Sequence, residues 1–124
     1  GGTNLLIQGL DTARVAARQG WLPTGGATAA AAPVAAFTTR RQLPVALATL
    51  LIPLESGDGD RPTVEVLPTD APLTIGVALR FADGQVDTLV VGPEPGPRGA
   101  GTLTGNARVL CRRDGPRATA RFAQ

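Results

Sequence analysis

Short apolar runs separated by turn-forming residues constrain the fold of this chain more than any other feature of its sequence. The β-prone runs cover residues 4–10, 14–22, 33–39 and 63–67, and most of them stop directly before an aspartate or a proline. Strands of this length between turn signals are typical of an all-β fold. The 124 residues amount to one domain and suffice for a single core. We therefore predict an all-β fold, a single antiparallel β-sandwich that spans residues 1–124.

The stretch RRQLPVALATLLIPLES, residues 40–56, contains a long apolar run whose structure is contested. Leu43 to Leu54 is about half the ~20 residues that a membrane-spanning helix needs, so we predict no membrane span. Leucines at helical spacing favour an amphipathic helix, whereas two alternating apolar faces and strand-like neighbours favour a strand. We predict a central strand with both faces covered that ends at Pro53. The alanines from Ala27 to Ala32, between a Gly-Gly pair and a proline, are predicted to form a loop.

The segment VALRFADGQVDTLVV, residues 77–91, carries the clearest hairpin signal. Asp83-Gly84 suits a two-residue turn, because both central positions of that turn need a positive φ. Such a turn would place Phe81 opposite Val86 and Arg80 opposite Asp87, so that opposite charges meet. The same register puts one apolar set on a single face of the hairpin: Val77, Leu79, Phe81, Val86 and Val90.

A second hairpin is predicted in ARVLCRRDGPRATARFA, residues 107–123, with its turn at Asp114-Gly115. A two-residue loop there would pair Arg112 with Arg117 and Arg108 with Arg121, and like charges directly opposite each other are unfavourable. Two explanations stay open. A longer loop around Pro116 would bend a solvated arginine face apart, or the guanidinium groups would bind uronate or sulfate, for which their forked donors are suited. The candidate glycan-binding residues are Arg108, Arg112, Arg117 and Arg121.

The residue types exclude most catalytic sites. The sequence has no His and no Tyr, so acid–base chemistry would fall to carboxylates, arginines or Cys111. Ser56 has no base to activate it. GDGDRP, residues 57–62, has the alternating aspartates of a calcium loop but lacks the later acidic ligand. The single Cys111 excludes an internal disulfide, and we predict a buried thiol. We predict no catalytic residue, no metal and no cofactor.

Charge and glycine content give no further site. All 12 basic residues are arginines and the net charge is +2, which is too small to indicate nucleic acid. The glycines of Pro97 to Asn106 lack the strand-turn-helix context of a phosphate loop, so we predict a plain loop. Trp21 could stack on a sugar ring, but beside alternating apolar residues it is predicted to lie in the core. The start at Gly1 and the lack of Met indicate a segment of a longer protein or a processed chain.

Three segments, NLLIQGLDTARVAARQGWLP, APVAAFTTRRQLPVALATLLIPL and GNARVLCRRDGPRATARF, follow the order of features of one known family. A strand leads to Gly20-Trp21, and an extended segment surrounds Ala32-Pro33-Val34. The strand from Leu43 ends at Pro53. The last hairpin carries Ala107-Arg108 and the run from Arg112 to Gly115. Over nearly its whole length the chain therefore resembles the C-terminal β-sandwich of heparinase II/III-like polysaccharide lyases.

The resemblance implies a longer enzyme that cleaves acidic, uronate-containing polysaccharides by β-elimination. An N-terminal α/α toroid would pack on this sandwich, in the periplasm or cell envelope of a high-GC bacterium. The Tyr and His catalytic groups of the family have no counterparts in this sequence, so none is carried over and the segment alone is expected to be inactive. The family's aromatic and acidic residues after the Gly-Trp pair are also missing from Thr24 to Thr28. The alternative is a free-standing carbohydrate-binding or structural β-sandwich.

Overall fold

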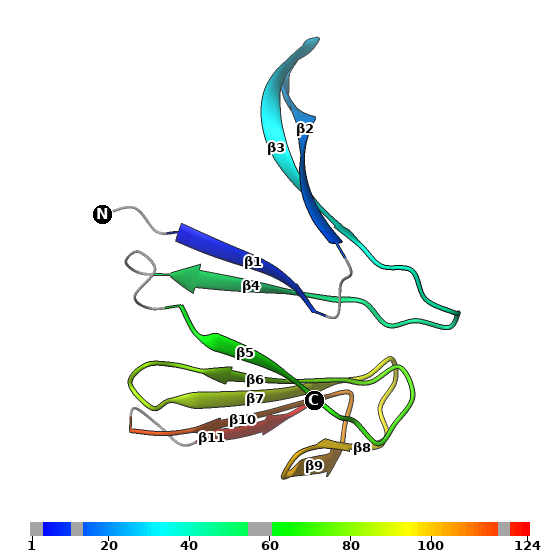
Figure 1. The fold of residues 1–124 in the computed structure, drawn as a ribbon, viewed down its shortest axis with the longest axis vertical. Coiled ribbons are helices and arrows are strands. Elements are labelled where there is room, and N and C mark those ends of the chain that lie inside the picture. The colour runs from blue at the N-terminus through cyan, green and yellow to red at the C-terminus, as the bar shows by residue number, and fades with distance from the viewer. Residues whose placement is uncertain (1–3, 11–13, 55–60, 117–119) are drawn as a thin grey trace.

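The computed structural model describes residues 4–10, 14–54, 61–116 and 120–124, and these residues form strands and loops without a helix (Figure 1). The strands are β1 (Asn4–Leu10), β2 (Arg14–Gly25), β3 (Thr28–Thr38), β4 (Ala48–Leu54), β5 (Thr63–Leu67), β6 (Ile75–Arg80), β7 (Val86–Val91), β8 (Pro97–Ala100), β9 (Leu103–Asn106), β10 (Val109–Asp114) and β11 (Ala120–Ala123). Every pairing among them is antiparallel. The predicted all-β, antiparallel fold class is confirmed.

The main body is a five-stranded sheet with the order β11-β10-β7-β6-β5. A ribbon of β1 and β4 forms the second layer on one face of this sheet, and the side chains between the layers make one core: Leu10, Ile52, Leu54, Val77 and Leu79. Burying an aliphatic side chain stabilises the fold by about 1.5–3 kcal/mol, so this cluster contributes roughly 10 kcal/mol before chain entropy is counted. The apolar alternation of the sequence therefore produces a sandwich, with an incomplete second layer.

The opposite face of the sheet is covered by the short hairpin of β8 and β9. A second core cluster lies there and consists of Val90, Ala100, Leu103, Ala107 and Leu110. The predicted plain loop over residues 97–106 is therefore wrong, because β8 and β9 pair with each other over these residues. Their apolar side chains cover β7 and β10, which explains why β6 is buried on both faces from Gly76 to Leu79.

β2 and β3 form a long hairpin, here named the arm (residues 14–38), that extends away from the two layers (Figure 1). Its turn uses Gly25 and Gly26 at φ +109° and +59°, a conformation that glycine adopts at low cost. The loop predicted for Ala27 to Ala32 is wrong from Thr28 onward. Thr28 to Ala32 pair with β2 residues, and these ladder hydrogen bonds outweigh the weak strand preference of alanine.

The contested stretch is a strand, as predicted, but a shorter and half-exposed one. β4 begins at Ala48 and continues through Pro53. Proline has no N–H to donate, and it is tolerated here because β4 pairs with β1 alone and is therefore an edge strand. Its inward side chains alternate with outward ones, and Leu51 is 63% exposed. The prediction of a central strand with both faces covered is therefore wrong, because β4 pairs with β1 alone and its outer face is exposed. No described helix is long and apolar enough to cross a membrane.

The β6–β7 hairpin has a three-residue loop in place of the predicted two-residue turn. Phe81 and Gln85 close the loop by a 2.9 Å backbone hydrogen bond, and Gly84 takes φ +87°. A three-residue loop with glycine in the left-handed region is the next most common hairpin type. The pairs become Arg80–Val86 and Leu79–Asp87. This one-residue shift moves Val90 to the opposite face, so the predicted pairs and the predicted single apolar face are wrong.

The last hairpin turns through a longer loop than the two residues predicted. Arg112 lies opposite Arg121, and Cys111 lies opposite Phe122. The predicted pairs Arg112–Arg117 and Arg108–Arg121 are therefore wrong, and Arg117 itself lies outside the described residues. The partner of Arg112 lies four residues later in the sequence than predicted. This register agrees with the first of the two explanations, a longer loop around Pro116.

Candidate functional site

The structure brings two of the four candidate glycan-binding arginines together. Arg112 and Arg121 face each other across β10 and β11, and Arg108 is exposed directly before β10. Arg112 Nε donates to Asp114 Oδ2 at 2.5 Å, and Arg121 Nη2 donates to the Thr104 carbonyl. Both guanidinium groups therefore have partners in their own chain and keep further N–H groups for an anion.

Another arginine has a structural partner that sequence reasoning missed. Arg113 donates from Nε and Nη2 to the carboxylate of Asp87, at 2.8 and 2.6 Å. The Asp87 side chain is 10% exposed and that of Arg113 is 52% exposed. The hydrogen bond to Asp87 is the main reason why the pKa of Arg113 is raised. An aspartate inside the apolar run of β7 was the signal for a buried partner.

Arg80 and Arg98 also serve the fold. Arg80 donates to Glu65 Oε2 from two nitrogens at 3.3 and 3.1 Å, so its partner is not the predicted Asp87. Arg98 is buried and donates to the carbonyls of Glu94 and Gly96. The guanidinium fills the place where a side chain at Gly92 would lie, so this loop depends on a glycine there.

The described residues provide no catalytic constellation. They contain no group of three or more His, Cys, Asp or Glu side chains that could hold a metal ion. Cys111 is half-buried, and burial is the main reason why its pKa is raised, followed by the charge of Asp87, while Arg113 lowers it. A thiol with a raised pKa stays protonated at neutral pH and is a poor nucleophile. Ser56 and the aspartates of residues 57–60 lie outside the described residues.

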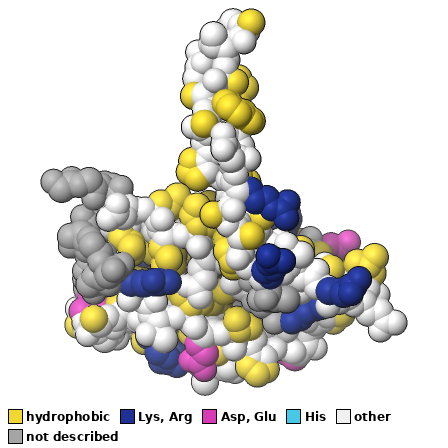
Figure 2. Space-filling view, turned by 45° about the horizontal axis from the view of Figure 1, so that its top comes forward, with side chains coloured by type: hydrophobic (Ala, Val, Ile, Leu, Met, Phe, Trp, Pro, Cys, Tyr) yellow, Lys and Arg dark blue, Asp and Glu magenta, His cyan; other side chains and the backbone are white. Residues whose placement is uncertain are grey.

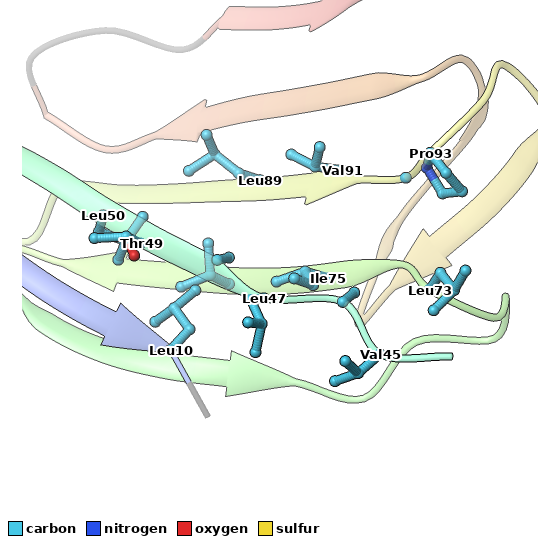
Figure 3. A pocket seen from close by; sticks show the side chains of 14 residues that line it. Leu10, Val45, Leu47, Thr49, Leu50, Leu73, Ile75, Leu89, Val91 and Pro93 are labelled. Carbon is cyan, nitrogen blue, oxygen red and sulfur yellow. The ribbon is translucent and has the colours of Figure 1, made fainter. Parts of the chain in front are cut away.

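An apolar cavity of about 500 Å³ lies between the segment that leads into β4 and the five-stranded sheet (Figure 3). Leu10, Val45 and Leu47 line one side, and Ile75, Leu89 and Val91 line the other. Thr49 carries the one polar side chain among the described residues around it. This cavity can bury apolar groups but offers no charge, acid or base to a substrate.

The arm exposes apolar side chains on both of its faces. One face carries Val15, Ala17 and Trp21, and the other carries Leu22 and Val34. Trp21 is 65% exposed, so the prediction that it lies in the core is wrong. Its strand pairs with β3 alone, and no second layer covers it. The apolar pattern of this strand is present, but the described part of the chain leaves it exposed.

The outer face of the β1–β4 ribbon is also apolar. Leu5, Ile7 and Leu51 are 56%, 43% and 63% exposed. Together with the four large side chains of the arm they define what we call the exposed apolar surface: Leu5, Ile7, Val15, Trp21, Leu22, Val34 and Leu51. Figure 2 shows hydrophobic side chains along the arm and on the body at its foot. Within the described part of the chain, nine of the 13 exposed large apolar side chains fall between Leu5 and Leu51.

Comparisons of the chain with protein-family models, curated proteins and solved structures found no match. The candidate site is therefore described by its own chemistry: an exposed apolar surface on the N-terminal half and an arginine pair, Arg112 and Arg121, on the C-terminal half.

Proposed function

We propose that this chain is a non-catalytic β-sandwich that docks on the catalytic domain of a polysaccharide lyase. The observation that carries the docking role is the exposed apolar surface, which the two layers of the sandwich leave uncovered. Several large apolar side chains left exposed on neighbouring elements indicate an interaction site. An isolated two-stranded hairpin is marginally stable in water, so a partner that covers the arm would also stabilise it.

The free energy available from burying the exposed apolar surface is comparable with the entropy cost of docking. Each of the seven side chains of the exposed apolar surface is about half exposed, so burying the rest gains roughly 1 kcal/mol apiece. The gross gain of roughly 7 kcal/mol is in the range that offsets much of the entropy cost of docking. A domain of the same polypeptide pays less of that cost, because the linker holds it at high effective concentration.

The lyase assignment rests on the sequence resemblance. An α/α toroid in the same polypeptide would supply the proton acceptor for the sugar C5 position, since this segment contains no His or Tyr. The substrate class is an acidic polysaccharide, cleaved by β-elimination in the periplasm or cell envelope. Arg108, Arg112, Arg117 and Arg121 remain the candidate contacts to its carboxylate or sulfate groups, supported by the direct opposition of the half-buried Arg112 and the exposed Arg121.

Activity and stability measurements test the two parts of the proposal. With alginate, heparin or heparan sulfate, the isolated segment is expected to give no unsaturated-uronate absorbance, while the parent chain gives it. Trp21→Ser with Leu22→Ser should lower the unfolding temperature of the parent chain and leave that of the isolated segment unchanged. Val66→Ser is the matched control, because Val66 is 50% exposed but lies on β5, away from the arm. If the Trp21→Ser, Leu22→Ser variant leaves the unfolding temperature of the parent chain unchanged, docking through the arm is rejected.

A free-standing carbohydrate-binding sandwich is the second candidate. It is favoured by the like-charge pair Arg112 and Arg121. Asp114 compensates Arg112, while Arg121 donates to the neutral Thr104 carbonyl, so an anionic sugar would supply a further counter-charge. In that case the isolated segment binds an acidic oligosaccharide, and Arg112→Gln with Arg121→Gln abolishes both the binding and its salt dependence. Unchanged binding in this double variant removes the arginine pair from the glycan site.

A further inference from the structure

The exposed apolar surface has a one-sided charge. Residues 14–54 contain Arg14, Arg18, Arg40 and Arg41 and no Asp or Glu. The carboxylates of the described residues all lie later in the chain: Glu65, Asp70, Asp83, Asp87, Glu94 and Asp114. Figure 2 shows arginine side chains at the foot of the arm, directly below its apolar stem. The arm is therefore cationic as well as apolar, whereas the strands of the ribbon carry no charge.

The register of the arm places two of these charges in a row. Arg14 lies opposite Thr38 and Arg18 lies opposite Val34, both on the same face of the hairpin. Four residues along a strand span about 13 Å. Farther toward the tip this face carries Leu22 beside small alanines. This face is therefore cationic at the open end of the hairpin, here called the root, and apolar near the turn, here called the tip. The opposite face carries Trp21.

The size of the arm indicates that both faces are covered in the docked state. A hairpin of this length is about 40 Å long and about 10 Å wide, so one face offers roughly 400 Å². A stable interface buries about 800 Å² on each partner. One face alone falls short of this area, whereas the two faces together reach it.

We propose that the arm lies in a groove of its partner domain whose walls are apolar near Trp21 and Leu22 and whose mouth carries carboxylates opposite Arg14 and Arg18. This proposal rests on the docking function proposed above and names the chemistry of the partner. The carboxylates would orient the arm and speed its docking, because complementary charges act mainly on register and association rate. Protein backbone at the groove could also pair with the free edges of the hairpin.

Two other occupants fit the surface less well. A second copy of this chain would bring another Arg14 and Arg18 to the same root, and like charges would oppose each other. An anionic lipid surface suits the arginines and Trp21, but a two-stranded hairpin in lipid leaves its edge N–H and C=O groups without partners, at several kcal/mol each. A protein groove is free of both penalties.

Hydrogen exchange across residues 14–38 tests the proposal in the parent chain and in the isolated segment. The arm is expected to exchange about tenfold more slowly in the parent chain at about 50 mM NaCl, and to lose the electrostatic part of that protection at about 500 mM while the apolar part remains. Arg14→Gln with Arg18→Gln should weaken the protection at low salt and make the remaining protection independent of salt. Arg61→Gln with Arg80→Gln is the matched control, since both arginines are exposed and lie outside the arm.

The outcomes separate the two levels of the proposal. If the arm is protected from exchange in the parent chain and neither salt nor the Arg14/Arg18 variant changes that protection, the carboxylate groove is contradicted but docking is not. Equal exchange in parent and isolated chains overturns docking and the groove together. Vesicles of phosphatidylglycerol that protect the arm of the isolated segment more than the parent chain does would assign the arm to a lipid surface and overturn the protein groove. The variants should keep the far-UV circular dichroism of the wild type, because Arg14 and Arg18 are exposed.

Discussion

Removing either partner of the Asp87–Arg113 ion pair should destabilise the fold, but by unequal amounts. Arg113→Ala leaves the carboxylate of Asp87, 10% exposed, without its two charge-assisted hydrogen bonds. Breaking a buried pair in this way costs about 3–5 kcal/mol, and the partial exposure of the pair places the expected value near the lower end. Asp87→Ala instead leaves Arg113, 52% exposed, free to hydrate, so we expect about 1–2 kcal/mol.

Urea unfolding followed by far-UV circular dichroism measures both values. Trp21 fluorescence would be a poor probe, because the indole lies on the exposed arm. The double variant should cost about as much as Asp87→Ala alone, because the buried charge has been removed in both. A larger loss for Asp87→Ala than for Arg113→Ala would refute the argument that exposure decides the asymmetry.

Further predictions concern the turn, the core and the thiol. Gly84→Val should cost about 1–2 kcal/mol, because φ +87° is strained for a β-branched residue, whereas Arg80→Ala should cost less than about 1 kcal/mol; urea unfolding checks both. Leu110→Ala, at a side chain 1% exposed, should cost about 2–5 kcal/mol in the same assay. Cys111 should react with iodoacetamide more slowly in the folded than in the unfolded chain, because burial raises its pKa. The same shift stabilises the fold below the unfolded pKa of the thiol, and this contribution should disappear as pH rises above about 9.

Local pattern predicted the strands and turns better than it predicted their partners. The strand from Asn4 to Leu10 and the turn at Asp83-Gly84 follow from β-branched or apolar runs and from residues that accept a positive φ. A two-residue and a three-residue loop have the same sequence signature here, and tertiary pairing decides between them. Asp87 pairs with Arg113 on β10, 26 positions along the chain, so no local rule could fix its register.

Burial was the second property that the sequence could not assign. Trp21 and Leu51 lie in regular apolar patterns, which is how buried residues also look. A pattern that is apolar because another domain covers it cannot be told from one that the chain covers itself. The lack of acidic residues from Arg14 to Leu54 is the sequence signal that distinguishes this segment, which we propose as an interface, from the rest of the chain.

The solvent accessibility of Trp21 tests the docking account most directly. It is the single tryptophan of the segment and is 65% exposed there, so hydroxyl-radical footprinting can follow its peptide by mass spectrometry in both contexts. If the arm docks, Trp21 should be strongly labelled in the isolated segment and about tenfold more weakly in the parent chain, where the arm is covered. Equal labelling of Trp21 in the two proteins would contradict the proposal that this sandwich docks through its arm.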